Sequence, residues 1–337
     1  MIIILKQKGV MMRLIILFLL LFNQLFSQEY ELGQGINIPS TPLYVGGYTT
    51  LDYLHRSDEY NRFRVDELAL LSYAHYKRFS FMTELLYKEP YVKEWGKIER
   101  EKTSTPLTIE RLYLEYRAND ALTLRVGKFN TPVGYWNLEP INVLRDSASN
   151  PYLAYIIYPR YTTGALVSYA DEMSSNSTYT LLAQENSDFD DNYNNISVKR
   201  HYALGYEYNL DDALHIKLNL GHFMTQGLEK SYYGVLALKY ETYKYKISSE
   251  FAMRQGDEKL SVPYSFYLQG VYNIKEKHDI ITRYETYKID EGALREEQIG
   301  VLGYTYRPLY PIALKIEYQA HTYTNENQLH MALSVMF

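Results

Sequence analysis

The chain has 337 residues, a formal net charge of −5 and no cysteine. The acidic balance excludes a partner such as nucleic acid, and the lack of cysteine excludes disulfides and a lipid carried on cysteine. After the N-terminal region, no apolar run approaches the roughly 18 residues that a membrane-spanning helix needs. Tyrosine is in excess, with 37 Tyr against 12 Phe and 2 Trp. Such amphipathic rings suit the two headgroup levels of a membrane.

The N-terminus has the pattern of a secretory signal peptide. Lys6, Lys8 and Arg13 precede an apolar stretch over residues 14–22, and residues 23–27 offer a polar break and a small residue. We therefore expect a signal peptide over residues 1–27 and a mature chain that starts near residue 28. Met11 and Met12 are alternative starts to Met1, and an uncleaved anchor is the alternative to cleavage. Residues 28–42 are then a short N-terminal periplasmic segment.

From residue 43 onward the dominant pattern has period two, which is the strand period. Between residues 312 and 319, for example, Ile, Leu, Ile and Tyr alternate with Ala, Lys, Glu and Gln. The length of such segments, about ten residues, is that of a transmembrane strand. The pattern predicts strands over residues 43–55, 64–76, 78–88, 107–118, 121–129, 162–170, 177–185, 200–208, 212–223, 231–241, 243–254, 264–273, 278–288, 297–307, 310–321 and 328–337.

The connections between these segments alternate in length. Those after even-numbered segments are short, and those after odd-numbered segments are generally longer. Tight turns at one end and larger loops at the other are typical of a membrane barrel, whereas a soluble β-sandwich with Greek-key crossovers has no reason to show them. The sequence therefore predicts an all-β fold over residues 43–337: a transmembrane antiparallel up-and-down β-barrel of about 16 strands.

Three segments carry a family resemblance. The last predicted strand alternates apolar residues and ends on Phe337, which resembles the terminal strand of bacterial outer-membrane proteins. The segments VGGYTTLDY (45–53) and LRVGKFNTPVGYW (124–136) are similar to phosphate-selective (O/P-like) porins and to general sixteen-stranded porins. The resemblance implies passive diffusion of small hydrophilic solutes across a Gram-negative outer membrane. It also implies a homotrimer among outer-membrane lipids and lipopolysaccharide, and recognition of the strand ending at Phe337 by the barrel-assembly machinery.

The longest connection, residues 130–161, lies between the fifth and sixth predicted strands and contains four prolines. A loop of this length inside a compact domain is normally functional or disordered, and its many aromatic and apolar residues argue against disorder. By resemblance it folds into the lumen as a constriction loop; an outward cap is the alternative. Its candidate site residues are Tyr135, Trp136, Glu139, Arg145, Asp146 and Arg160.

Charges on the inward face of the strands set the selectivity of such a pore. Basic residues outnumber acidic ones on the strands with clear alternation, so we expect a mild anion preference, with an unselective lumen as the alternative. We match no cluster of basic residues like that of the anion-trapping relatives. The predicted pore-lining residues are Arg111, Glu115, Arg117, Arg125, Lys217, Lys244, Lys246, Glu250, Arg254, Lys315 and Glu317.

No motif for catalysis, a cofactor or a resident metal is recognisable. Residues 185–195 (ENSDFDDNYNN) concentrate oxygen ligands for a divalent cation, but their spacing matches no calcium loop, and a solvated loop is the simpler interpretation. GxSxG and HExxH are missing from the sequence, although catalytic triads can assemble from distant residues. An outer-membrane enzyme of the lipase or protease type and a non-conducting structural or adhesin barrel are the competing functions.

Overall fold

The structure is a computed structural model that describes residues 33–97, 99–103, 107–171, 175–190, 196–257, 261–290, 294–324 and 326–337. The predicted signal peptide, residues 1–27, lies outside the described residues. Within them, no helix is long and apolar enough to cross a membrane.

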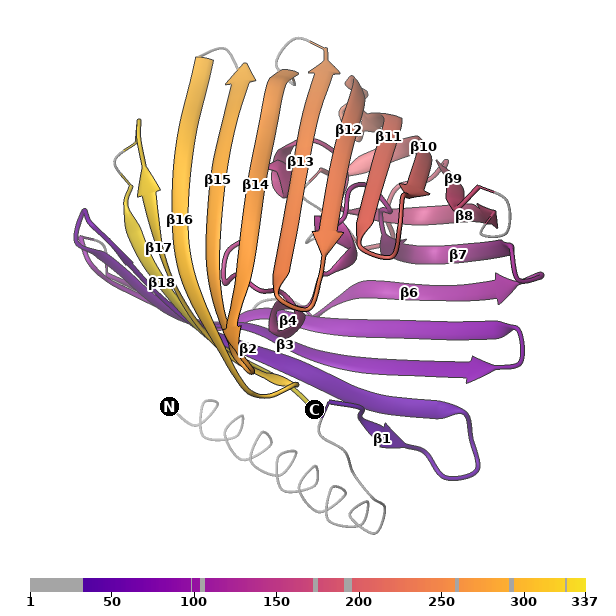
Figure 1. Cartoon of the computed structure of the whole chain (residues 1–337), viewed down its shortest axis with the longest axis horizontal. Helices are drawn as coiled ribbons and strands as arrows, with labels where there is room; N and C mark the ends of the chain where they lie inside the picture. Colours follow the sequence, from indigo (N-terminus) through magenta and orange to yellow (C-terminus); the bar gives the residue numbers. More distant parts are fainter. Residues whose placement is uncertain are drawn as a thin grey trace, which may run out of the picture.

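Long antiparallel strands form a single closed barrel (Figure 1). The barrel closes where β18 pairs with β2, from Gln328 opposite Arg56 to Met336 opposite Tyr48. The sixteen long strands are β2 (Leu43–Arg56), β3 (Tyr60–Tyr76), β4 (Phe79–Gly96), β6 (Leu107–Arg117), β7 (Leu122–Asn130), β8 (Tyr161–Asp171), β9 (Ser177–Gln184), β10 (Val198–Asn209), β11 (Leu214–Thr225), β12 (Lys230–Glu241), β13 (Tyr245–Gly256), β14 (Ser261–Lys275), β15 (His278–Asp290), β16 (Leu294–Leu309), β17 (Ile312–His321) and β18 (Gln328–Met336).

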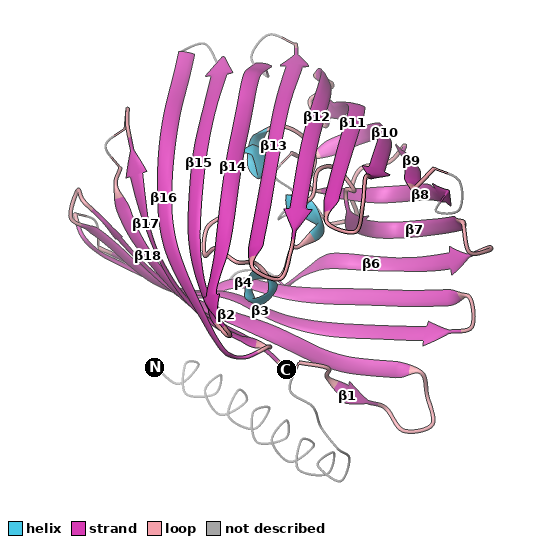
Figure 2. Ribbon diagram, viewed as in Figure 1, coloured by secondary structure: helices cyan, strands magenta, loops and turns pink. Residues whose placement is uncertain are grey.

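Two short strands supplement them. β1 (Ile36–Asn37) pairs with the start of β2, and β5 (Arg100–Thr103) pairs with the far end of β4. The predicted closed barrel of about 16 antiparallel strands is thus confirmed, and each predicted segment overlaps one long strand, several of which extend beyond it. Figure 2 shows that the described chain is almost entirely strand, with its helical turns confined to the connection between β7 and β8.

The two ends of the barrel differ in their connections. At one end, the turn end, lie the C-terminal Phe337 and short turns such as residues 77–78, 276–277 and 310–311; Phe337 there exchanges backbone hydrogen bonds with Gly47. At the other, the loop end, the expected longer connections are found at 97–106, 131–160, 185–197 and 322–327. The expectation is wrong for 57–59, 226–229, 257–260 and 291–293, because the flanking strands run further than their hydrophobic alternation suggested.

Apolar side chains cover the outside of the wall. Val126, Leu204 and Met253 are each more than half exposed although they sit in mid-strand. A row of aromatic rings follows the turn end, where neighbouring strands contribute stacked or tilted pairs: Phe79 with Tyr116, Tyr179 with Tyr206, and Tyr245 with Tyr272. An apolar band edged by tyrosine is a surface suited to contact with a bilayer rather than with water.

Candidate functional site

Residues 131–160, which we call the lumen loop, leave β7 and cross the interior before β8 begins. The loop contains the short helices η1 (Trp136–Leu138), η2 (Asn142–Leu144) and α2 (Leu153–Ile156). Gly134 makes the inward turn with φ +65°, and a Cβ there would lie 2.3 Å from a carboxylate oxygen of Glu250. This position therefore requires glycine for both its backbone angle and its close approach to the wall.

An apolar core fixes one face of the lumen loop to the wall. Val133, Leu153, Ile157 and Tyr158 are at most 1% exposed. They pack on inward apolar and aromatic side chains of the wall, which the alternation of charged residues did not predict. Those partners include Leu166, Leu182, Ala203, Phe223, Tyr233, Val235, Ala252, Val262, Tyr267 and Ile289 of β8–β15.

Charged side chains of the wall hold the loop backbone. Glu250 Oε1 accepts hydrogen bonds from the Tyr135 and Trp136 amides, both at 2.8 Å. Glu317 accepts one from the Ala148 amide at 2.9 Å, and Lys315 Nζ donates to the carbonyl of Ser147 at 3.1 Å. Carboxylates thus meet loop N–H groups and ammonium groups meet loop carbonyls, which satisfies groups that burial would otherwise leave unpaired.

Several residues predicted to line the pore therefore lie beneath the loop. Glu250, Lys315 and Glu317 are at most 4% exposed, as is Lys217, which lies 5.5 Å below the Tyr135 ring and 3.6 Å from Glu207. Arg254 is also buried. These side chains face inward, as their alternation predicted, but they contact protein rather than an open passage.

The remaining predicted wall residues lie elsewhere. Arg111 pairs with the buried Glu84, and Arg125 pairs with Glu115. Arg117 is exposed at the end of β6. Lys244 lies in the turn after β12, with its ammonium group 5.7 Å from the ring of Tyr272 on the outer face.

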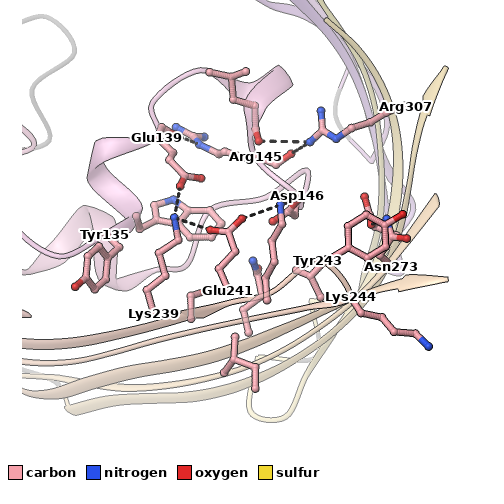
Figure 3. Close-up of a pocket in the computed structure, with 18 of the residues that line it drawn as sticks. Tyr135, Glu139, Arg145, Asp146, Lys239, Glu241, Tyr243, Lys244, Asn273 and Arg307 are labelled. Carbon is pink, nitrogen blue, oxygen red and sulfur yellow. Dashed lines mark hydrogen bonds and ion pairs between the residues drawn. The ribbon is translucent and has the colours of Figure 1, made fainter. Parts of the chain in front are cut away.

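A cavity of about 550 Å³ opens between the lumen loop and the turn end of β12–β16 (Figure 3). Lys239 pairs with Glu139 at 3.3 Å and with Glu241 at 3.2 Å. Lys246 pairs with Asp146 at 3.3 Å. The loop acids and the wall lysines of this turn-end cavity thus neutralise each other across it.

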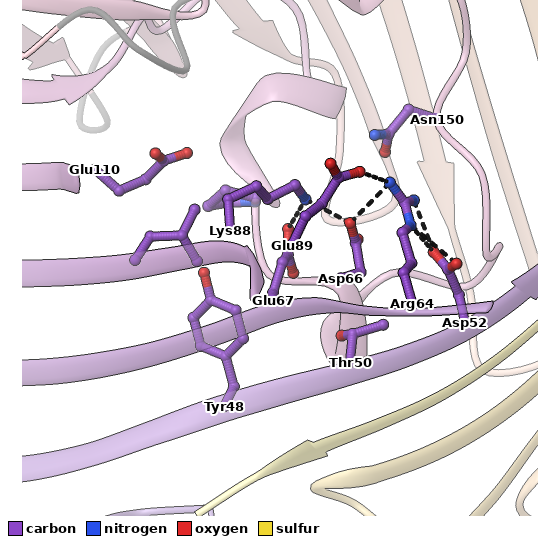
Figure 4. A network of polar contacts seen from close by, with 12 residues as sticks. Tyr48, Thr50, Asp52, Arg64, Asp66, Glu67, Lys88, Glu89, Glu110 and Asn150 are labelled. Atoms are coloured by element: carbon purple, nitrogen blue, oxygen red, sulfur yellow. Dashed lines mark hydrogen bonds and ion pairs between the residues drawn. The ribbon is translucent and has the colours of Figure 1, made fainter. Parts of the chain in front are cut away.

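A second cavity, of about 570 Å³, lies between the lumen loop and the inner face of β2–β4 near the loop end. Figure 4 shows the network that lines its wall. Arg64 contacts Asp52 at 2.7 Å, Asp66 at 3.1 Å and Glu89 at 2.6 Å. Lys88 contacts Asp66 at 2.9 Å and Glu67 at 3.0 Å. Arg145 lines both cavities.

The network of this loop-end cavity was missed by sequence analysis, although it left a signal. Arg62, Arg64 and Asp66 stand two residues apart on β3, which is the spacing of one strand face. The register of β3 shifts against both neighbours between Val65 and Glu67. Such a bulge brings two successive residues, here Asp66 and Glu67, to the same cavity.

The oxygen-rich segment after β9 has a structural role in its described part. Asp190 Oδ2 accepts a hydrogen bond from the Ile109 amide at 2.7 Å, and the Asp190 carbonyl accepts one from Lys128. Ile109 lies beyond the point where β6 pairs with β7, which starts at Leu112 opposite Lys128. The segment thus covers the opening left where the chain turns into the lumen. No group of three or more metal-ligating side chains is present among the described residues.

The sequence matches no protein-family model and no curated protein. Solved structures with the same fold are nevertheless found. The outer membrane channel DcaP of Acinetobacter baumannii has 12% sequence identity and a TM-score of 0.61 over 90% of this chain and 100% of its own. The anion-selective porin from Comamonas acidovorans has 11% identity and a TM-score of 0.62 over 88% and 100%. OmpT of Vibrio cholerae, in a trimer form, has 11% identity and a TM-score of 0.61 over 88% and 99%. The chain therefore has the fold of the sixteen-stranded outer-membrane porins.

Proposed function

We propose that the protein is a porin, a channel for passive diffusion of small hydrophilic solutes across the outer membrane of a Gram-negative bacterium. The observation that carries this proposal is the position of Arg145, which lines a polar cavity on each side of the lumen loop. Solutes then enter at the loop end, pass the loop beside Arg145 and leave at the turn end. The width of a sixteen-stranded barrel, which exceeds what wall side chains alone fill, supports conduction.

The proposal includes a weak anion preference. Arg62, Arg145 and Arg160 line the loop-end cavity, and none of them has a carboxylate partner in the described part of the chain. Of the carboxylates that line the same cavity, Glu110 alone lacks a basic partner among the residues that the structure describes; its described hydrogen bond comes from the Tyr161 hydroxyl. Membership of the phosphate-selective group stays a prediction, which rests on residues 45–53 and 124–136 alone.

Cellular placement and assembly belong to the same proposal. The apolar outer band and the tyrosines of the turn end support contact with outer-membrane lipids and lipopolysaccharide. Cleavage after residue 27, and recognition of the β18 strand by the assembly machinery, complete the expected route. A homotrimer is supported by an apolar hollow on the outside of the wall, which is lined by Leu51, Tyr53, Leu314, Met331 and Leu333 of β2, β17 and β18.

Single-channel recording tests the proposal. The chain from residue 28 onward, refolded in detergent and added to planar bilayers, is expected to give steady ohmic steps, with a reversal potential on the anion side in a salt gradient. Steps of cation-selective sign would remove the anion preference and keep the porin. A folded barrel without steps would overturn the porin and favour an outer-membrane enzyme or a plugged structural barrel.

A further inference from the structure

The strand pairing of the wall is interrupted between β6 and β7 at the loop end. β6 pairs with β7 only from Leu112, opposite Lys128, toward the turn end. Residues 107–111 of β6 pair with β4 on one side and, within the described chain, with no strand on the other. β7 continues beside β8 as far as Asn130 and then turns into the lumen. Because a free strand edge leaves backbone groups without a strand partner, this part of the wall has to be closed by other groups.

Residues 185–190, which we call the strap, cover the outer side of the interruption. The strap reaches the free edge of β6, where Asp190 Oδ2 accepts a hydrogen bond from the Ile109 amide at 2.7 Å. Its side chains are mostly exposed, with Phe189 at 50%, and it contributes no residue to the apolar cores of the described chain. A segment with few buried apolar contacts opens at a low cost in free energy. The strap therefore has the properties of a movable cover.

Lys128 lies beneath the strap on the outer face of β7. It shares this face with Val126, two residues earlier, which is 53% exposed, yet Lys128 itself is only 2% exposed. Its ammonium group donates to the Asp190 carbonyl and lies 5.5 Å from the Tyr161 ring and 5.6 Å from the Phe189 ring. No carboxylate pairs with it in the part of the chain that the structure describes. A buried ammonium group without a counter-ion favours an anion that takes the place of the strap carbonyl.

The Tyr161 ring also borders the loop-end cavity on the inner side of the interruption. Tyr161 and Arg160 both line that cavity, and the Arg160 guanidinium lies 5.5 Å from the Tyr161 ring. The Tyr161 hydroxyl donates to Glu110, whose charge is thus held at the hydroxyl end of the ring. A single aromatic ring therefore contacts one cation of the cavity, Arg160, and one cation of the outer face, Lys128.

We propose that this interruption is a lateral port, through which the anion of a single-chain carboxylic acid, such as a medium-chain fatty acid, passes between the surrounding membrane and the loop-end cavity. The carboxylate moves between Lys128 and Arg160 as the strap and the Tyr161 ring give way. The hydrocarbon chain lies along Val126 and Leu114, which pair with each other and are exposed on the outer face. The port accepts one chain, because one aromatic ring fills it when closed. The inference goes beyond the proposed porin function, since it adds a second route and a solute that arrives from the membrane.

A thiol inside the cavity reports which route a reagent takes. The chain has no native cysteine, so Ser149→Cys, on the lumen loop and in the lining of the loop-end cavity, provides a single reactive group. This reporter protein is reconstituted in lipid vesicles and treated with one of three maleimides. Maleimidohexanoate is a short carboxylate that stays in water, maleimidoundecanoate is a long carboxylate that enters the bilayer, and the primary amide of the latter is its uncharged match. Mass spectrometry of the protein gives each labelling rate.

The port predicts a dependence on both the chain and the head group of the reagent. Per amount of reagent in the bilayer, maleimidoundecanoate is expected to label about tenfold faster than its amide, the factor for one charge-assisted hydrogen bond. Asp190→Ala, which frees the strap from Ile109, should accelerate both long reagents and leave the short one unchanged. Lys128→Met should bring the ratio of long carboxylate to amide toward one, whatever it does to the strap. Lys199→Met is the control, because Lys199 is exposed on β10 and lines neither cavity.

The same rates separate the port from the porin. A long carboxylate that labels no faster than its amide, or a ratio that Lys128→Met leaves unchanged, would overturn the port and leave the strap as a seal. This head-group comparison decides the matter even if Asp190→Ala does not fold. If the long reagents label the thiol and the short one does not, the cavity is not reached from water, so the porin proposal fails and the port stands. If no reagent labels the thiol, both proposals fail.

Discussion

The lumen loop meets the two sides of the barrel in different ways. Toward β8–β15 it presents apolar residues, which pack on alanine, valine and aromatic side chains of the wall. Toward the loop end of β2–β4 it presents Arg145, Asn150 and Arg160, opposite a network of carboxylates and bases around a cavity. Nearer the turn end, Ile141 and Val143 of the loop pack on apolar side chains of the same strands. The apolar contacts hold the loop in place, and the charged network leaves room for solutes.

This difference explains why a charge count along the strands says little about the passage. Many inward charges on β12–β17 contact the loop: Glu250 and Lys315 bind its backbone, and Lys239 pairs with Glu139. Charges on β2–β4 point inward as well but bind one another beside open space. The position of the loop, rather than the direction of a side chain, decides which wall residues a solute meets.

The largest effect is expected at the apolar contact between the lumen loop and β8–β15. In a Leu153→Ala/Ile157→Ala variant, each substitution is expected to cost about 2–5 kcal/mol of loop attachment, because both side chains are fully buried. The part of the loop around α2 should then loosen, and single-channel recording should show larger and noisier steps. Leu138→Ala is the control, since Leu138 is 44% exposed on the same loop. Unchanged conductance in the double variant would mean that the apolar contact does not hold the loop.

The role of the charged network on β2–β4 is best tested by replacing Arg64. Replacing it with alanine leaves Asp52, Asp66 and Glu89 without their shared partner, and breaking a largely buried ion pair costs about 3–5 kcal/mol. The added negative charge should also move the reversal potential toward cations. Arg200→Ala removes an exposed pair and should cost less than about 1 kcal/mol. A reversal potential that stays in place would show that ions do not pass beside β2–β4.

A smaller effect is expected at Glu250, which joins the loop turn to the wall. Glu250→Ala leaves the amides of Tyr135 and Trp136 without an acceptor, at about 1–3 kcal/mol for each buried group. Glu250→Gln keeps a carbonyl oxygen and should recover part of this loss. Proteolysis of the loop in the folded barrel measures the effect. Equal cleavage of the two variants would argue that these hydrogen bonds do not hold the turn.

The sequence predicts those features of the fold whose pattern lies within one short segment of the chain. Strand positions follow from period two within one segment, so residues such as Leu314 and Lys315 were assigned to the correct faces. Bulges break that rule: the register shift opposite Glu84 lets both Glu110 and Arg111 act inside the barrel, one at Tyr161 and one at Glu84. One inserted residue moves every later side chain of the strand to the opposite face, and the local sequence pattern does not show where the insertion lies.

The contacts of the lumen loop with the wall join residues that are far apart in the sequence. The partners of Tyr135 and Ala148 lie on β13 and β17, more than one hundred residues away in sequence. Sequence analysis identified the loop and its candidate residues, because a long aromatic connection is unusual. It could not pair those residues with the wall, because pairing depends on barrel closure. For the same reason Asp190, within the segment interpreted as a solvated loop, could not be assigned to the Ile109 amide.

The smallest effect is expected in a turn that touches neither side of the lumen loop. In the turn between β10 and β11, Asp211 Oδ1 accepts hydrogen bonds from the Ala213 and Leu214 amides at 2.8 and 2.7 Å, and these bonds hold the pKa of its carboxyl below the usual value. A lowered pKa means that the ionised carboxylate stabilises the folded turn above the unfolded pKa, near 4, and that this contribution is lost as the pH falls through the folded pKa. Asp211→Ala should therefore lower the thermal midpoint slightly at pH 7 and less at acidic pH, whereas Asp211→Asn, which keeps an acceptor, should change it little.

Conductance should be the same in both Asp211 variants, because the turn lies outside both cavities. A pH-independent difference between Asp211→Ala and wild type would rule out the carboxylate as the cause. A change in conductance would mean that the turn end of the wall moves with the loop. The position of the loop would then depend on the turns of the barrel as well as on the loop's own apolar and polar contacts.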